Sequence, residues 1–284
     1  MSQIKVCAPS RIYSAHTCGN FSIGSMIDYM SAMKFDGVDM SFETLSRGDN
    51  SYRSIFYAAK QKAISKKLDI PSCHLPFYMP DPSNESKMYD FAQDIKAGID
   101  AAALMQIPLA VIHPIALHKK NASVEKWAVA NLRFLTPLRD YAREKGVELL
   151  IENMASSCEG EDDHLYGCAA AEILALAEAL DVKCCWDFGH ANLARRPINE
   201  VEMLGGRLAL VHAHDNDGET DGHLIPFEGK IDWRSAMKSL SNMRYRGYIN
   251  IEVRAWHIPK DPIIRADFGR KVLQAGKKLS DMIR

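Results

Sequence analysis

The sequence predicts an α/β protein built as a single (β/α)₈ TIM barrel. Short apolar runs rich in β-branched residues recur along the chain, and stretches with helical periodicity separate them. The length of 284 residues suffices for such a barrel, which needs about 250. We expect one domain over residues 1–284, because no linker rich in Pro, Gly or Ser divides the chain.

Eight apolar runs have the length and composition of buried parallel strands. They are Ile4–Ala8, Gly37–Phe42, Pro71–Pro76, Leu109–Pro114, Glu148–Asn153, Val182–Asp187, Leu208–His214 and Tyr248–Val253. The stretches between them carry apolar residues at i, i+3 and i+4, as expected of helices that pack outside a sheet. The predicted helices are Ser54–Lys67, Lys87–Met105, Val124–Lys145, Ala169–Ala179, Trp233–Asn242 and, as the eighth helix of the barrel, Pro262–Ile283.

Composition and charge exclude several classes of protein. Hydrophobic residues make up 47% of the chain and charged residues 25%, which is typical of a globular protein with a sizeable core. The 35 Lys and Arg residues balance the 36 Asp and Glu residues, so a nucleic-acid partner is disfavoured. No export is predicted, because the first residues lack the basic and apolar regions of a secretion signal. The sequence has no apolar run of about 18 residues and no C-x-x-C pair. We expect a cytoplasmic protein with reduced thiols and no membrane partner.

Six acidic or imidazole side chains stand where predicted strands end. They are His74, His113, Glu152, Asp187, His212 and Glu252. Parallel strands of a barrel deliver their carboxyl ends to one face, so these side chains should converge on one axis. A single one could merely satisfy loop backbone, but burying several together is costly without a compensating cation.

The chemistry of this set indicates a divalent metal ion. Oxygen and nitrogen ligands without a thiolate suit Mn²⁺ or Zn²⁺ best, with Mg²⁺, Co²⁺ and Fe²⁺ as alternatives. A second set, His190, Asp221 and His223, follows in loops after the sixth and seventh strands. These residues are candidates for further ligation or substrate binding, and loop hydrogen bonding is an equally good interpretation.

The order and spacing of seven short motifs resemble the xylose-isomerase-like barrel superfamily, which holds sugar and sugar-phosphate isomerases and epimerases and the endonuclease IV family. The motifs are His74-Leu75-Pro76, Val111-Ile112-His113-Pro114, Leu150-Ile151-Glu152-Asn153, Trp186-Asp187-Phe188-Gly189-His190, His212-Ala213-His214-Asp215-Asn216, Phe227-Glu228-Gly229-Lys230-Ile231-Asp232-Trp233 and Ile251-Glu252-Val253-Arg254. Together they span residues 74 to 254.

The resemblance implies a metal site. By similarity to tagatose-epimerase-like members, one Mn²⁺ or similar ion would be held by Glu152, Asp187, His212 and Glu252. His212 heads the family's His-x-x-acid pattern, and His214 also fits that pattern, through Asp217. By similarity to endonuclease IV, the chain also supplies counterparts of nine ligands of a three-metal cluster, the additional five being His74, His113, His190, Asp221 and His223. The number of ions therefore stays open between one and three.

The resemblance also implies a metal-dependent sugar or sugar-phosphate isomerase or epimerase. Glu152 and Glu252 would flank the substrate as proton donor and acceptor, and the ion would stabilise the enediolate formed when a carbon-bound proton leaves. Residues expected to bind the substrate are His190, His214, Lys230 and Arg254. Gly218 stands six residues after His212, where tagatose-epimerase-like members carry an arginine, which counts against a free ketohexose.

Two alternative activities use the same barrel. One is an endonuclease IV-like phosphoesterase with two or three ions, which the nine-residue match favours. The third loop, Tyr78-Met79-Pro80-Asp81-Pro82, counts against DNA because it is uncharged or acidic, although Arg47, Tyr52 and Arg53 lie in the second. The other alternative is a metal-dependent lyase or dehydratase. Related epimerases often pair, so a homodimer is expected by analogy alone.

Overall fold

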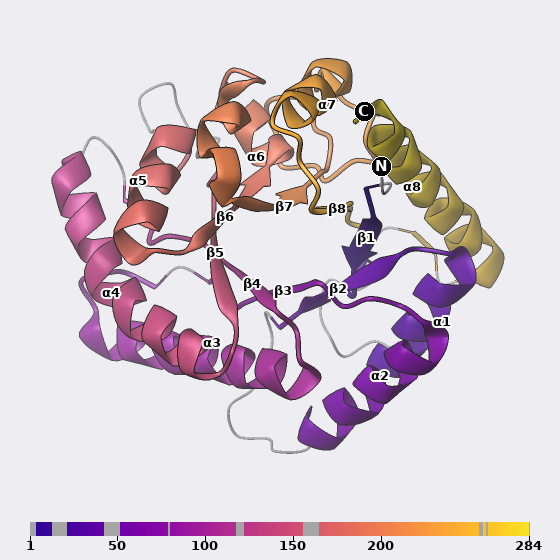
Figure 1. Ribbon diagram of the computed structural model, residues 1–284, viewed down its shortest axis with the longest axis horizontal. Helices are drawn as coiled ribbons and strands as arrows, with labels where there is room; N and C mark the ends of the chain where they lie inside the picture. The colour runs from indigo at the N-terminus through magenta and orange to yellow at the C-terminus, as the bar shows by residue number, and fades with distance from the viewer. Residues whose placement is uncertain are drawn as a thin grey trace.

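The computed structural model describes residues 4–12, 22–42, 52–78, 80–117, 122–155, 165–255, 258–259 and 261–283. Eight parallel strands follow one another in sequence order and close into a barrel, with the last strand pairing with the first (Figure 1). The predicted (β/α)₈ TIM barrel is therefore confirmed. That residues 1–284 form one domain stays a prediction. Arg47 and Met79 lie outside the described residues, as does the side chain of Tyr52.

The strands overlap the eight predicted runs. They are β1 (Val6–Pro9), β2 (Gly37–Ser41), β3 (Ser72–His74), β4 (Leu109–Ile112), β5 (Glu148–Glu152), β6 (Lys183–Asp187), β7 (Leu208–His212) and β8 (Tyr248–Asn250). Most predicted runs extend too far at the carboxyl end, because the chain stays apolar after it leaves the sheet. Leu75, Ala213 and Val253 are buried although they lie beyond the ends of β3, β7 and β8.

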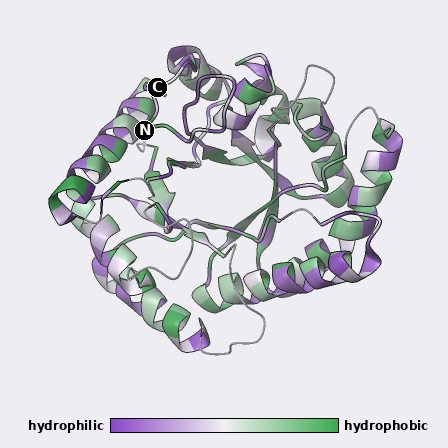
Figure 2. Ribbon diagram, turned by 180° about the vertical axis from the view of Figure 1, so that it is seen from behind, coloured by the Kyte–Doolittle hydropathy of each residue, from purple (hydrophilic) through white to green (hydrophobic). Residues whose placement is uncertain are grey.

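Helices surround the barrel. Figure 2 shows that the strands enclosed by these helices are mainly hydrophobic, whereas the helices carry both hydrophobic and hydrophilic residues. They are α1 (Ile23–Met33), α2 (Tyr52–Lys66), α3 (Glu85–Met105), α4 (Val124–Glu144), α5 (Ala170–Leu180), α6 (Phe188–Leu193), α7 (Trp233–Asn242), α8 (Pro262–Met282) and the 3₁₀ helix η1 (Glu200–Arg207). Three of these, α1, α6 and η1, lie outside the predicted helices. Apart from its cap Ser22, α1 lacks the usual signals, because its first turn has no acidic residue and its last no basic one.

Strand alternation separates two apolar layers. Val111, Leu150, Cys185 and Leu210 form a small buried cluster of their own. Their neighbours along the strands, such as Ile112 and Ile151, belong to the large core shared with the helices. Because residues two apart on a strand face the same side, the small cluster fills the barrel interior. The next interior positions, one layer nearer the carboxyl ends, are His113, Glu152, Asp187 and His212.

Two smaller expectations concern helices and thiols. No helix in the described ranges is long and apolar enough to cross a membrane. Cys7, Cys73, Cys184 and Cys185 are free and buried, and Cys168 is buried as well. A cytoplasmic location stays a prediction.

The interior layer beneath the strand ends should support the barrel strongly. Leu150 is fully buried in that layer, so we expect Leu150→Ala to lower the free energy of unfolding by about 2–5 kcal/mol. Val129 on α4 is 65% exposed, so Val129→Ala should change it by less than about 0.5 kcal/mol. Urea denaturation followed by circular dichroism measures both. Equal losses in the two variants would contradict a tightly packed interior layer.

Candidate metal centre

Glu152 is the centre of the predicted site. It ends β5, is fully buried and lies among three imidazoles. Its Oε2 is 3.2 Å from Nε2 of His74 and 2.9 Å from Nε2 of His113, and its Oε1 is 2.7 Å from Nδ1 of His212. The same Nδ1 is 2.9 Å from Oε2 of Glu252. Barrel closure has therefore brought the ends of β3, β4, β5 and β7 and the segment after β8 together.

The predicted ligands fall into overlapping groups. The possible ligand atoms of each group lie within 4.8 Å of one another. The first group is Glu152, Asp187, His212 and Glu252, and the second is His74, His113 and Glu152. The third is Glu152, Cys185 and His212, and the fourth is His190, His214, Asp221 and His223. The first contains the four residues expected to hold one ion, and we call it the inner group. We call the last the outer group. His214, an alternative to His212 in the sequence, lies in the outer group.

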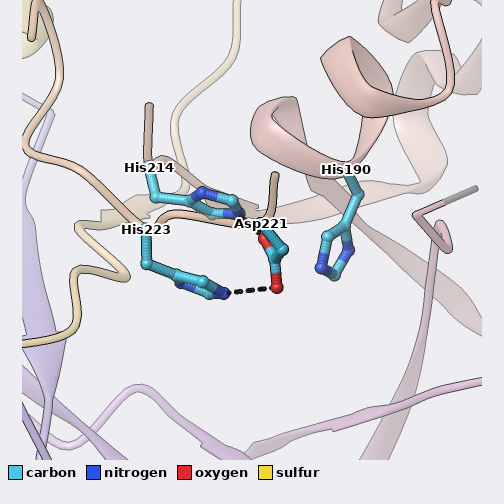
Figure 3. A group of neighbouring side chains, drawn as sticks. All are labelled: His190, His214, Asp221 and His223. Atoms are coloured by element: carbon cyan, nitrogen blue, oxygen red, sulfur yellow. Dashed lines mark hydrogen bonds and ion pairs between the residues drawn. The ribbon is translucent and has the colours of Figure 1, made fainter. Parts of the chain in front are cut away.

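The outer group is built from two segments of the chain (Figure 3). His190 lies on α6, and the other three residues follow β7. The His214 and His223 rings stack at 3.9 Å, and Nε2 of His223 lies 3.1 Å from Oδ2 of Asp221. Nε2 of His214 is 3.1 Å from Oδ1 of Asp187, which joins the outer group to the inner one.

Three imidazoles already use one ring nitrogen on a backbone carbonyl. Nδ1 of His74 pairs with the carbonyl oxygen of Leu75 at 2.8 Å. Nδ1 of His190 pairs with that of Asn153 at 2.9 Å, and Nδ1 of His223 with that of Glu252 at 2.5 Å. A neutral imidazole has one N–H, so the other nitrogen then presents a lone pair. In His74 and His223 that lone pair faces a carboxylate oxygen. Two acceptors at this distance repel unless a proton or a cation lies between them.

A cation suits the contact between His223 and Asp221 better than a proton. Burial and the neighbouring His214 lower the pKa of His223, so its ring is neutral near pH 7. Burial also lowers the pKa of His113, although Glu152 opposes this. Metal-bound imidazoles commonly donate their second nitrogen to a carbonyl or carboxylate, as His223 does.

Other imidazoles of the site attract positive charge. Burial opposes the charged form of His190, but Asp187 and Glu152 outweigh it and raise its pKa to about 9. Burial also opposes the charged form of His212. Cys185 and the Glu152 and Glu252 carboxylates outweigh this effect, so the pKa of His212 rises well above its usual value. A divalent cation would satisfy the same carboxylates in place of these protons.

Several buried polar atoms of the site have no hydrogen-bond partner among the described residues. They are Oδ2 of Asp187, Nε2 of His212, Nδ1 of His214 and Oδ1 of Asp221. Buried polar atoms are nearly always paired, so this concentration in one place requires an explanation. Together with the facing lone pairs, it shows that the residues present fit a divalent cation.

Three polar residues that stand in the sequence motifs, but to which the sequence analysis gave no role at the site, hold it in place. The Asn153 side chain accepts from the N–H of Asp187 at 2.7 Å and donates to its carbonyl at 2.9 Å. Asp215 accepts from the indole of Trp233 at 2.7 Å and from three backbone N–H groups of the segment after β7. Asn216 donates to the carbonyl of Gly189 at 2.9 Å. Their position in the sequence could have indicated this role. Asn153 directly follows Glu152, and Asp215 and Asn216 directly follow His214.

Two residues expected to bind substrate differ in position. Nη1 of Arg254 lies 3.5 Å from Oδ2 of Asp221, at the edge of the outer group. Lys230 is exposed and donates its backbone N–H to Asn216 at 2.9 Å. Neither role is tested by these contacts, and both stay predictions.

Fold and site together define a class: a (β/α)₈ barrel with a carboxylate- and imidazole-rich candidate metal centre at the carboxyl ends of its strands. The sequence model of the xylose isomerase-like TIM barrel family matches residues 27–271. The chain therefore belongs to this family.

Individual relatives are more distant. An uncharacterised protein of Sinorhizobium fredii is 30% identical over 165 residues, 56% of this chain and 51% of that protein. The fructoselysine 3-epimerase of Escherichia coli O157:H7 is 28% identical over 123 residues, 42% of this chain and 43% of that enzyme. These alignments thus span about half the length of each relative. The crystal structure of a D-tagatose 3-epimerase-like protein has a TM-score of 0.75 at 22% identity and covers 98% of both chains.

Gly189 leaves room for His214. A Cβ atom at Gly189 would lie 2.0 Å from Cε1 of His214, so Gly189→Ala should displace that ring and cost about 1–3 kcal/mol of unfolding free energy. Gly206→Ala is the control, because nothing lies within 4 Å of its Cβ position. We expect the Gly189 variant alone to bind less metal, measured by elemental analysis. Equal metal content in the two variants would contradict a ligand role for His214.

The outer group should hold an ion of its own. We expect Asp221→Asn to remove about one ion per chain from protein purified without added metal, because it removes a charged ligand atom. Asp267→Asn on α8, where the carboxylate is exposed, should leave the metal content unchanged. Elemental analysis per chain measures both. An unchanged content in Asp221→Asn would restrict binding to the groups around Glu152.

Proposed function

We propose that the chain is a metal-dependent epimerase or isomerase of sugars or sugar phosphates. One observation carries the proposal: the Glu152 and Glu252 carboxylates lie 2.7 and 2.9 Å from the same nitrogen of His212, one from the end of β5 and the other from the segment after β8. The E. coli relative named as a fructoselysine 3-epimerase supports a sugar substrate.

The inner group, Glu152, Asp187, His212 and Glu252, would hold the cation that this chemistry requires. When bound, a divalent cation supplies electrophilic stabilisation of the negative charge that develops on neighbouring oxygens. Mn²⁺ and Zn²⁺ remain the ions we favour.

Proton transfer is assigned to the two glutamates. Burial opposes ionisation of both, but His212 is the largest opposing influence and lowers their pKa well below the usual value. Both therefore start ionised at neutral pH, and either can accept a proton from a carbon next to a carbonyl. Inversion of that carbon then requires a different proton at its opposite face, which comes from solvent or from the second glutamate after that glutamate has taken up a solvent proton.

The glutamates differ in access. The Glu152 side chain is fully buried and contacts three imidazoles, whereas that of Glu252 is 15% exposed. Glu252 also lines a pocket at the rim of the barrel. We therefore assign the first contact with the substrate carbon to Glu252 and a mainly ligating role to Glu152.

The outer group favours a second candidate function. Separate ions in the two groups would suit hydrolysis of a phosphoester, in which two or three ions activate water and stabilise the leaving oxygen. The products distinguish the two candidate functions. A phosphoesterase splits its substrate into an alcohol and a phosphate product, whereas an epimerase leaves the composition of its substrate unchanged.

The proposal predicts solvent exchange at carbon. Incubation of the holoprotein with a panel of ketoses and ketose phosphates in D₂O should place deuterium beside the carbonyl of the substrate, detected by NMR. Glu252→Gln should lower kcat/KM by about 10²–10⁴, the contribution of a positioned base. Glu228→Gln, on the exposed turn before α7, is the control. Turnover without deuterium, or cleavage of abasic DNA in place of sugar turnover, would refute the proposal.

A further inference from the structure

We propose that a pocket between the chain segments after β1 and β8 binds an anionic substituent of the substrate, a phosphate monoester or a carboxylate. The inference rests on the proposed function in one respect, namely that the substrate is a sugar. It narrows that function from sugars in general to sugars that carry an oxyanion group.

Two arginines line this pocket. Arg11 and Arg254 share it with Glu252, the glutamate assigned to proton transfer. The two segments are held together, because β1 and β8 pair and the N–H of Ala255 donates to the carbonyl of Ile12 at 2.8 Å. The pocket is small, which suits a substituent of a ligand better than a whole sugar.

Arg11 connects the pocket with the inner side of the metal centre. Its guanidinium carbon lies 5.6 Å from the centre of the Phe77 ring. That ring lies in turn 5.4 Å from the ring of His74 and 5.5 Å from that of His113. The Phe77 ring would therefore lie between a group bound at Arg11 and the candidate ligands His74 and His113.

Arg254 connects the pocket with the outer group through its contact with Asp221 at 3.5 Å. The pocket thus lies beside both groups, and its lining includes Glu252 of the inner group. A sugar whose reacting carbon meets Glu252 would carry a neighbouring substituent into this pocket.

Charge and geometry both favour an oxyanion. Burial lowers the pKa of Arg11 to about 10, which still leaves it positively charged at neutral pH. Glu252 and Asp221, the carboxylates beside the two arginines, are candidate metal ligands. A cation bound there would offset their negative charge, so an incoming anion would meet less repulsion from these two carboxylates. Guanidinium presents paired donors that match the oxygens of phosphate and carboxylate.

Binding of inorganic phosphate to the holoprotein tests the subsite without requiring turnover. We expect Arg11→Met and Arg254→Met each to weaken phosphate binding about tenfold or more in calorimetric titration, since each removes hydrogen bonds to a charged group. Arg133→Met, in the middle of α4 where the side chain is exposed, should bind phosphate like the unmodified chain. Arg254→Lys keeps a charge and the fold, and should restore part of the affinity.

Several results would overturn the subsite. One is that the unmodified holoprotein does not bind phosphate. Another is that the Arg11 and Arg254 variants bind phosphate as well as the unmodified chain does, which is expected if phosphate binds only a metal ion. Equal loss in Arg133→Met would also overturn it, because the effect would then be one of overall charge.

Paired substrates identify the anionic group. A ketose phosphate, a keto sugar acid and the neutral ketose are compared in the unmodified chain and in both arginine variants. The subsite predicts a rise of about tenfold or more in KM for one anionic substrate and no change for the neutral one. If phosphate binding depends on both arginines but no sugar is turned over, the proposed function fails and the subsite stands. If sugars are turned over with equal KM in all variants, the subsite fails and the function stands.

Discussion

The burial of Glu152 is the constraint on which the rest of the site depends. An ionised carboxylate without solvent contact is strongly disfavoured unless its charge is matched. Here three imidazoles from β3, β7 and the end of β4 surround it. These contacts form only when the barrel closes in the observed strand order, so closure of the fold and assembly of the site are one event. Each imidazole that turns its lone pair toward a carboxylate leaves a place for positive charge.

The convergence of these side chains was predictable because it follows from two simple periodicities. A parallel barrel delivers all carboxyl strand ends to one face, and alternation places residues two apart on the same side of a strand. Leu150 and Glu152, or Leu210 and His212, therefore occupy successive interior layers without any long-range information. The apolar member of each pair supports the polar one from below, and both are visible in the sequence.

Positions beyond the strand ends were not predictable in this way. His212 and His214 are two residues apart, so continued extension of β7 would keep both on one side. The strand ends at His212, although Ala213 still donates to the carbonyl of Asn250 at 2.9 Å. His214 then lies over Gly189, where a larger residue would collide with it. A pattern of residue types does not reveal where a ladder ends. The support from Asp215 was hidden for the same reason, because three of its four donors come from residues 12 to 18 positions later.

Asp187 shows why the two groups act as one electrostatic unit. Its ligand atom belongs to the inner group, its Oδ1 caps α6 by accepting from the N–H of His190 at 2.7 Å, and the same oxygen lies 3.1 Å from His214. A cation in either group draws on this one carboxylate, so occupation of one group alters the affinity of the other. The arginines near Glu252 and Asp221 experience the sum of these charges. Metal occupancy would therefore set the strength with which the rim of the barrel attracts an anion, which links the number of bound ions to the choice of substrate.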